Sequence, residues 1–276
     1  MTTPATAPVP PLPPAPSLPW RTWLVMFARL LAVQGSWNYE LMLGTGIGYA
    51  TEPALRSLPG GLGGAAYHEA LARQSRYFNA HPYLAAVAVG ALARAELAGQ
   101  PPAQIERFRS AMCGPLGSVG DRLVWAGWLP CCSMLALLAY GLGAGAAAVV
   151  TLFLVVYNVG HIGLRAWGLR VGWRNGLRVA SALANPVLRR GPQYIARAVL
   201  VLAGAAIPLA IRRALAGVVL APAPGPIVGT VSTAAAASIL GAAALGVALG
   251  WLHGRVEGWR AALVVLAALI IFSVIR

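Results

Sequence analysis

The fold is decided by residues 123–160, which read LVWAGWLPCCSMLALLAYGLGAGAAAVVTLFLVVYNVG and contain no charged side chain. About 20 apolar residues are enough to cross the hydrocarbon core of a bilayer, and this run is nearly twice as long. Glycines at positions 141, 143 and 145 interrupt the run and favour a tight turn there. We therefore expect two apolar helices that cross a membrane as an antiparallel pair.

The composition of the whole chain agrees with a membrane protein. Of its 276 residues, 58% are hydrophobic and 10% are charged, whereas soluble domains carry about 25% charged residues. The 21 basic residues are all arginine, and with 7 acidic residues they give a net charge of +14. Nucleic-acid binders place such charge on a solvated face around a packed core, and the long uncharged runs leave no room for that arrangement. An ordinary cytosolic enzyme and a nucleic-acid partner are both disfavoured.

The pattern predicts an all-α, polytopic membrane protein with full-length, short, and re-entrant or discontinuous helices. We expect a Pro-rich disordered tail over residues 1–19 and a membrane domain over 20–276. Outside the 123–160 run, the expected segments are an interfacial helix at 20–43, a polar region at 45–76, an apolar piece too short to span at 82–93, a solvated helix through Glu96, Glu106, Arg107 and Arg109, and apolar pieces at 198–211, 231–252 and 261–275. The alternative for the short apolar pieces is that they are buried core or interfacial helices.

The arginines indicate an orientation. Seven of them fall between Arg165 and Arg197, and no acidic residue occurs from Arg122 to Val256. The positive-inside rule therefore places this segment in the cytoplasm.

Polar residues beside Gly or Pro form four clusters at the edges of the apolar runs: Ser36–Glu40, Phe78–Pro82, Gly114–Asp121 and Tyr157–His161. Polar groups in lipid are costly and tend to face a cavity or a partner. Together the clusters supply the amides, imidazoles, carboxylates and aromatic faces that bind a sugar. Each residue also has a structural alternative. Asn79 with His81 could cap a helix, Asp121 could pair with Arg122 or cap the next helix, and Asn158 could hydrogen-bond between helices.

Motifs for bound cofactors or metals are missing from the sequence. The three cysteines and four histidines lack the spacing of a zinc site or a disulfide framework. Residues 61–66 satisfy G-x-G-x-x-A but follow no strand, and a chain without lysine cannot contain a Walker A motif. We expect no cofactor, no metal and no catalytic residue of the chain's own.

The clusters are similar to those of the IID membrane subunit of the mannose/fructose/sorbose family of the bacterial phosphoenolpyruvate-dependent sugar phosphotransferase system. The matching stretches are residues 36–42 with Gly48, Tyr49 and Pro53–Leu55; residues 77–84; residues 114–121 with Trp125; and Tyr157, Asn158, His161, Arg165, Gly168, Gly172, Trp173 and Gly176. The resemblance covers about residues 29–176, and residues 177–276 are diverged. Two departures are Cys113, where the family usually has Met, and Arg122, where it usually has a small hydroxyl residue; an arginine there could neutralise Asp121.

The resemblance implies a multi-pass subunit of the bacterial cytoplasmic (inner) membrane. With a IIC partner, such a subunit translocates a hexose or related sugar of the mannose class, while separate IIA and IIB proteins carry the phosphoryl group and IIB phosphorylates the sugar. In the family, IIC and IID look like related, oppositely oriented halves that assemble into larger oligomers, and IID carries no phosphorylated residue. The alternative is a diverged orphan subunit with a regulatory or assembly role. A membrane-embedded enzyme is disfavoured, since no nucleophile and base pair is recognisable.

The candidate site follows from the clusters and the resemblance together. The expected lining of the sugar path or of the IIC contact is Trp37, Asn38, Glu40, Asn79, His81, Asp121, Asn158 and His161. The expected unwound backbone beside it is Gly114, Pro115, Gly117 and Gly120.

Overall fold

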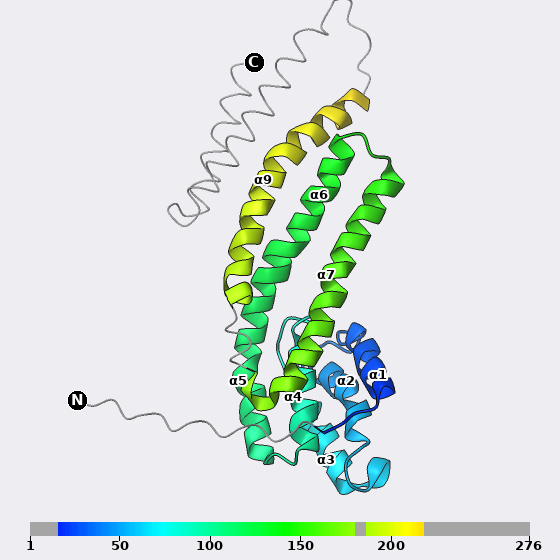
Figure 1. Cartoon of the computed structure of the whole chain (residues 1–276), viewed down its shortest axis with the longest axis vertical. Coiled ribbons are helices and arrows are strands. Elements are labelled where there is room, and N and C mark those ends of the chain that lie inside the picture. Colours follow the sequence, from blue (N-terminus) through cyan, green and yellow to red (C-terminus); the bar gives the residue numbers. More distant parts are fainter. Residues whose placement is uncertain (1–15, 180–185, 218–276) are drawn as a thin grey trace, which may run out of the picture. The chain divides into compact units, whose positions relative to one another are not determined.

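The computed structural model describes residues 16–179 and 186–217, which are helical with no strand (Figure 1). In chain order the elements are α1 (Trp20–Leu31), α2 (Gly44–Leu55), η1 (Gly61–Gly63), α3 (Ala65–Gln74), α4 (Ala85–Leu97), α5 (Pro102–Gly120), η2 (Asp121–Trp128), α6 (Leu129–Gly141), α7 (Ala146–Asn175), η3 (Gly176–Arg178) and α9 (Pro186–Gly217). The all-α expectation is confirmed. The expected apolar pieces at 231–252 and 261–275, and residues 1–15 of the expected tail, lie outside the described residues.

Three helices in the described part are long and apolar enough to cross a membrane: Pro102–Gly141, Ala146–Arg178 and Leu188–Ala214. The first two contain the 123–160 run and confirm the expected pair of apolar helices. The third contains the 198–211 piece, which was expected to be too short to span. It reaches spanning length because the helix also includes the more polar residues before 198.

The described residues form two compact units, which we treat separately. One contains residues 16–123 with 158–179 and 186–189, and the other contains residues 124–157 with 190–217. The candidate site residues all belong to the first unit.

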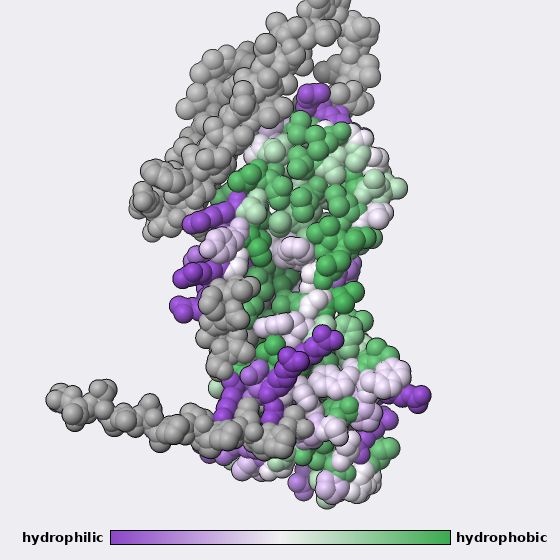
Figure 2. All heavy atoms as spheres, viewed as in Figure 1, coloured by the Kyte–Doolittle hydropathy of each residue, from purple (hydrophilic) through white to green (hydrophobic). Residues whose placement is uncertain are grey.

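In the second unit, α6 and the first part of α7 run antiparallel across the predicted turn, in which Gly143 has φ 108°. The Trp128 indole also links them by donating to the Tyr157 carbonyl at 3.3 Å. Arg213 of α9 donates to the carbonyls of Tyr140 and, at 2.8 Å, Ala144, and so caps the C-terminal end of α6. The face of α6 and α7 in Figure 2 is largely hydrophobic, as a lipid-facing surface should be.

The core of the first unit is α4, whose residues from Ala85 to Glu96 are all buried. This short helix therefore follows the alternative reading of a buried core helix. It crosses the C-terminal half of α7 at glycines. A Cβ on Gly90 would lie 2.2 Å from the Leu169 carbonyl oxygen, and one on Gly172 would lie 2.1 Å from the Val87 carbonyl oxygen. Only small residues allow two helix backbones to approach this closely.

The charged residues from Glu96 at the end of α4 to Arg109 in α5 differ from the expected solvated helix. Glu96 is 6% exposed and Arg109 is 2% exposed. Both find partners on α3: Arg73 pairs with Glu96 at 2.8 Å, and the neutral Gln74 side chain accepts a hydrogen bond from Arg109 at 2.7 Å. Glu106 and Arg107 of the same segment are partly or fully exposed.

The interfacial helix expected at 20–43 is shorter in the structure. Helix α1 ends at Leu31, and successive turns follow through residues 32–37. Its buried side is narrow, with Met26 and Leu30 inward and Trp20, Leu24 and Leu31 exposed. An amphipathic helix of this kind is typical of a membrane interface.

Candidate functional site

The 32–43 loop carries three of the predicted site residues, and all three are exposed: Trp37, Asn38 and Glu40. The Asn38 side chain is used by its own loop. Its Oδ1 accepts from the backbone N–H groups of Glu40 at 3.0 Å and Leu41 at 2.8 Å, and its Nδ2 donates to the Ser36 carbonyl at 3.2 Å. This Asx-type turn presents Trp37 and Glu40 on the surface.

The same loop is joined to the second polar cluster by backbone hydrogen bonds. Phe78 donates to the Leu41 carbonyl at 3.2 Å and accepts from Leu43 at 2.9 Å, across an isolated bridge at Met42. Met42 adopts a left-handed conformation with φ 53°, uncommon for a side chain of this size. Asn79 next to this bridge is exposed.

His81 is buried immediately before α4, with 1% of its surface exposed. Its ring lies against the backbone of Gly120, where a Cβ would come within 2.2 Å of the His81 Cβ. Its Nδ1 accepts from the Tyr83 backbone N–H at 3.2 Å. Burial, together with the nearby Arg165 guanidinium, lowers the pKa of His81 from 6.5 to about 4. The imidazole is therefore neutral at physiological pH.

Tyr83 connects His81 with the fourth cluster. Its ring meets His81 edge-on at 5.0 Å and stacks on His161 of α7 at 4.2 Å with an interplanar angle of 16°. We call His81, Tyr83 and His161 the histidine–tyrosine column. Asn158 lies one helical turn before His161, with its Oδ1 3.3 Å from the His161 Nδ1. The column and Asn158 together thus bring three of the predicted residues next to one another: His81, Asn158 and His161.

Arg165 holds the column against the rest of the unit. Its guanidinium lies 4.9 Å from the centre of the Tyr83 ring and donates to the Leu30 carbonyl at the end of α1. The residue is 2% exposed, and its position four residues after His161 places both on one face of α7. One buried arginine therefore joins α1, α7 and the segment leading into α4.

The third cluster is helical where unwound backbone was expected. Gly114, Pro115, Gly117 and Gly120 lie within α5. The irregular backbone comes directly afterwards, in η2, a π-helical segment of eight residues. Asp121, the first residue of η2, is exposed, and Arg122 donates to the Ser118 carbonyl at 3.2 Å.

Sequence reasoning left Tyr83 and Arg165 out of the site, although both lie in or beside the quoted clusters. The available signal was the spacing, because Arg165 follows His161 by one helical turn and Tyr83 follows His81 by two residues. The residue types of Tyr83 and Arg165 do not by themselves distinguish a site residue from a packing residue.

The arrangement can donate and accept hydrogen bonds, and it contains no activated nucleophile. Among residues 16–179 and 186–217, no group of three His, Cys, Asp or Glu side chains could hold a metal ion. The half-buried Asn158 and His161, with exposed Asn79 and Asp121, offer amide, imidazole and carboxylate groups to a polar ligand or a protein surface.

Comparison with known proteins identifies the family of the chain that carries this arrangement. The sequence model of the phosphotransferase system mannose/fructose/sorbose family IID component matches residues 18–221, which is more than half of the chain. The chain belongs to this IID family. The matched range contains every residue of the column and extends past Gly176, where the resemblance read from the sequence ends.

Curated relatives of this IID protein include the fructose permease IID component of Bacillus subtilis strain 168, 32% identical over 166 residues, which are 58% of each chain. The mannose-specific EIID component of Escherichia coli K12 is 28% identical over 172 residues, 60% of this chain and 59% of that one. The IID chain thus spans less than two thirds of the length of these relatives.

Solved structures also resemble it, among them the following two. The cryo-electron-microscopy structure of the mannose transporter ManYZ in complex with microcin E492 has a TM-score of 0.51 and 26% identity over 68% of this chain and 70% of that chain. A structure described as a membrane protein has a TM-score of 0.59 and 25% identity over 69% of this chain and 70% of that chain. The candidate site therefore lies in a membrane-helix fold similar to that of these two structures.

Proposed function

We propose that this IID protein is a membrane subunit of a phosphoenolpyruvate-dependent sugar phosphotransferase permease. It acts with a IIC partner in the bacterial inner membrane to translocate a hexose or related sugar of the mannose class, which IIB phosphorylates with phosphoryl groups from IIA. The observation that carries the proposal is the histidine–tyrosine column, which brings polar groups of two clusters together beside a membrane-length helix.

The column supports a role in contact rather than in chemistry. Its imidazoles and the Asn158 amide can bind sugar hydroxyls or a facing subunit, whereas phosphoryl transfer needs a nucleophile that the separate IIB protein supplies. His81 is covered by Gly120, so the accessible part of this surface is Asn158 and His161. We therefore assign those two residues to the sugar path or to the IIC contact, and His81 with Tyr83 to positioning them.

The domain layout is part of the proposal. We propose that residues 20–276 form one IID-like membrane domain behind a Pro-rich tail at 1–19, and that the subunit works as an oligomer with IIC. The family model matches residues 18–221, and the relatives are named IID components of sugar-specific systems, which supports a IID-like domain over the matched residues.

The test is sugar uptake in a bacterial strain that lacks its own mannose-family IID subunit. The full chain is expressed with the IIC, IIB and IIA proteins of its source organism, and uptake and phosphorylation of radiolabelled mannose, fructose and sorbose are measured. We expect uptake of at least one sugar, and a loss of 10-fold or more in His161→Ala and Asn158→Ala. Val159→Ala is the matched control, because Val159 is a 67% exposed apolar residue on the same turn of α7.

Membrane fractions quantify each variant, so that loss of uptake is separated from loss of protein. Full uptake by both His161→Ala and Asn158→Ala would remove this surface from the sugar path. If the wild-type chain supports no uptake and does not co-purify with IIC, the orphan-subunit alternative replaces the transport proposal.

A further inference from the structure

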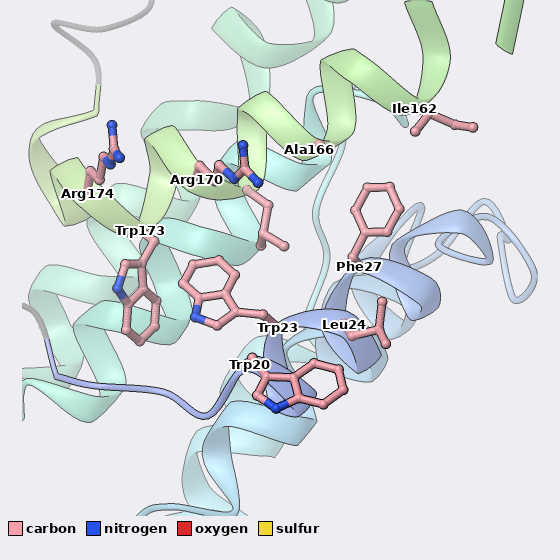
Figure 3. Close-up of a pocket in the computed structure, with 10 residues that line it drawn as sticks. Trp20, Trp23, Leu24, Phe27, Ile162, Ala166, Arg170, Trp173 and Arg174 are labelled. Atoms are coloured by element: carbon pink, nitrogen blue, oxygen red, sulfur yellow. The ribbon is translucent and has the colours of Figure 1, made fainter. Parts of the chain in front are cut away.

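A groove of about 650 Å³ lies in the first unit between α1 and the C-terminal half of α7, apart from the histidine–tyrosine column (Figure 3). Its walls include Trp20, Trp23 and Leu24 of α1 and Arg170, Trp173 and Arg174 of α7. We propose that this groove binds an anionic phospholipid, with an acyl chain along the aromatic wall and the headgroup phosphate at the two arginines.

The groove has an apolar wall with aromatic side chains from both helices. Trp23 and Trp173 meet edge to face at 5.2 Å between α1 and α7. Trp20 and Leu24 remain 68% and 57% exposed beside them. Such a surface suits an acyl chain, and its volume falls within the range of small-molecule sites, roughly 300–1,000 Å³.

Positive charge without counter-charge borders this wall. Arg170 and Arg174 lie one turn apart on α7, both are exposed, and their guanidinium groups point away from the tryptophan rings. Neither makes an ion pair within the described residues, α1 contains no acidic residue, and the sequence has none between Asp121 and Glu257. The flexible arginine stems can bring both charges to one phosphate.

The length of the spanning helix indicates where along the membrane normal the groove lies. The helix Ala146–Arg178 has 33 residues and is about 50 Å long at 1.5 Å per residue, whereas the hydrocarbon core is about 30 Å thick. Its N-terminal part is uncharged up to Arg165, so the arginine-bearing end extends into the headgroup region. Tryptophans and an amphipathic helix such as α1 belong at the same depth.

Charge complementarity decides between occupants. A protein segment seated here would have to supply carboxylates at the two arginines and an apolar side chain row beside them. A phospholipid of the bilayer supplies the phosphate and the acyl chain in one molecule, and it is present at this depth at high local concentration. Basic sites beside membrane helices on the cytoplasmic side characteristically bind anionic headgroups.

The test is lipid retention by the full chain, purified in mild detergent and analysed by native mass spectrometry. Dioleoylphosphatidylglycerol, dioleoylphosphatidylcholine and the soluble compound glycerol 3-phosphate are added in turn at equal concentration. We expect phosphatidylglycerol to bind at least 5-fold more tightly than phosphatidylcholine, with no binding of glycerol 3-phosphate. The double variant Arg170→Gln/Arg174→Gln should lose the preference for phosphatidylglycerol, and Trp20→Ala should weaken the binding of both lipids.

The matched control is Arg189→Gln/Arg190→Gln, which removes the same charge from two exposed arginines outside the groove. An equal loss of preference in this control would mean that the lipid is attracted by the net surface charge of the protein, and it would overturn the proposed site. Binding of glycerol 3-phosphate as tight as that of the lipid would also overturn it, in favour of a soluble phosphate.

A photo-crosslinker at Leu24, in membranes that also contain the IIC partner, identifies the occupant directly. A crosslink to phospholipid supports the proposal, and a crosslink to protein would identify the groove as a subunit interface instead. The outcome is independent of sugar uptake, so the lipid site can fail while the transport proposal stands.

Discussion

The glycine crossing between α4 and α7 predicts that adding one methyl group at Gly90 destabilises the protein. The new Cβ would lie 2.2 Å from the Leu169 carbonyl oxygen and 2.7 Å from the Trp173 amide nitrogen. Both are backbone atoms, so no side chain can rotate away, and the helices must separate by roughly 1 Å to reach van der Waals contact near 3.5 Å. Overpacking of this kind costs typically 1–3 kcal/mol.

Gly163→Ala on α7 is the matched control, because nothing lies within 4 Å of a Cβ at Gly163. Alanine is favoured over glycine in a helix by about 1 kcal/mol, so this variant should be as stable as the wild type or more stable. The two substitutions are chemically identical, yet only Gly90→Ala should lower the free energy of unfolding.

Thermal unfolding in detergent, followed by tryptophan fluorescence, measures the difference. A loss of about 2 kcal/mol lowers the melting temperature by roughly 4–8 °C in a chain of this size. Uptake by Gly90→Ala should also fall at temperatures where the protein is folded, since the column spans the segment before α4 and His161 of α7. A melting temperature of Gly90→Ala at or above that of Gly163→Ala would refute the close crossing.

Three further predictions concern the site and its supports. The pKa of His81 is lowered to about 4, so the free energy of unfolding should fall by up to roughly 3 kcal/mol as the pH drops from 6.5 towards 4. His81→Gln should flatten the plot of the free energy of unfolding against pH in that range, and an unchanged slope would mean that another group titrates there. Arg94 donates to the carbonyls of Trp173 (3.0 Å) and Arg174 at the end of α7, so Arg94→Gln should lower the free energy of unfolding by about 2 kcal/mol and speed amide hydrogen exchange there. Exchange as slow as in the wild type would argue against a role of Arg94 in capping α7. Asn79→Ala and Asp121→Ala should abolish sugar uptake without changing membrane insertion, and normal uptake in both would exclude them from the site.

The long helices could be predicted from the sequence because their signal is local. The uncharged run at 123–160 specifies two membrane-length helices, and its glycines specify the turn, including the left-handed Gly143. The burial of Glu96 and Arg109 could not be predicted in the same way. Their partners on α3 lie 22 or more residues away, and a charge that is hydrogen-bonded to a partner at such a distance cannot be distinguished in sequence from a solvated one.

Only part of the site could be predicted from the sequence, because the residues that share it also lie far apart along the chain. Asn38 uses its side chain within its own turn, an alternative that every asparagine beside a turn carries. Asn158 and His161 lie one turn apart on α7, whereas His81 reaches them through the Tyr83 ring, which comes from the segment leading into α4. Residue types indicated which side chains are polar, whereas the tertiary packing decided which of them share a surface.

The arginines show most clearly how packing changes an interpretation from composition. Arg165 donates to the carbonyl end of α1, Arg94 to that of α7, and Arg213 to that of α6. The last carbonyls of a helix have no partner within the helix, and leaving them unsatisfied away from water is costly, so a guanidinium at this end satisfies hydrogen bonds and the helix dipole together. Arg165 therefore contributes to the fold and cannot be counted with the charges that orient the chain. The exposed Arg170, Arg174, Arg189 and Arg190 carry the positive-inside argument, and the first two are the same side chains that border the proposed lipid groove.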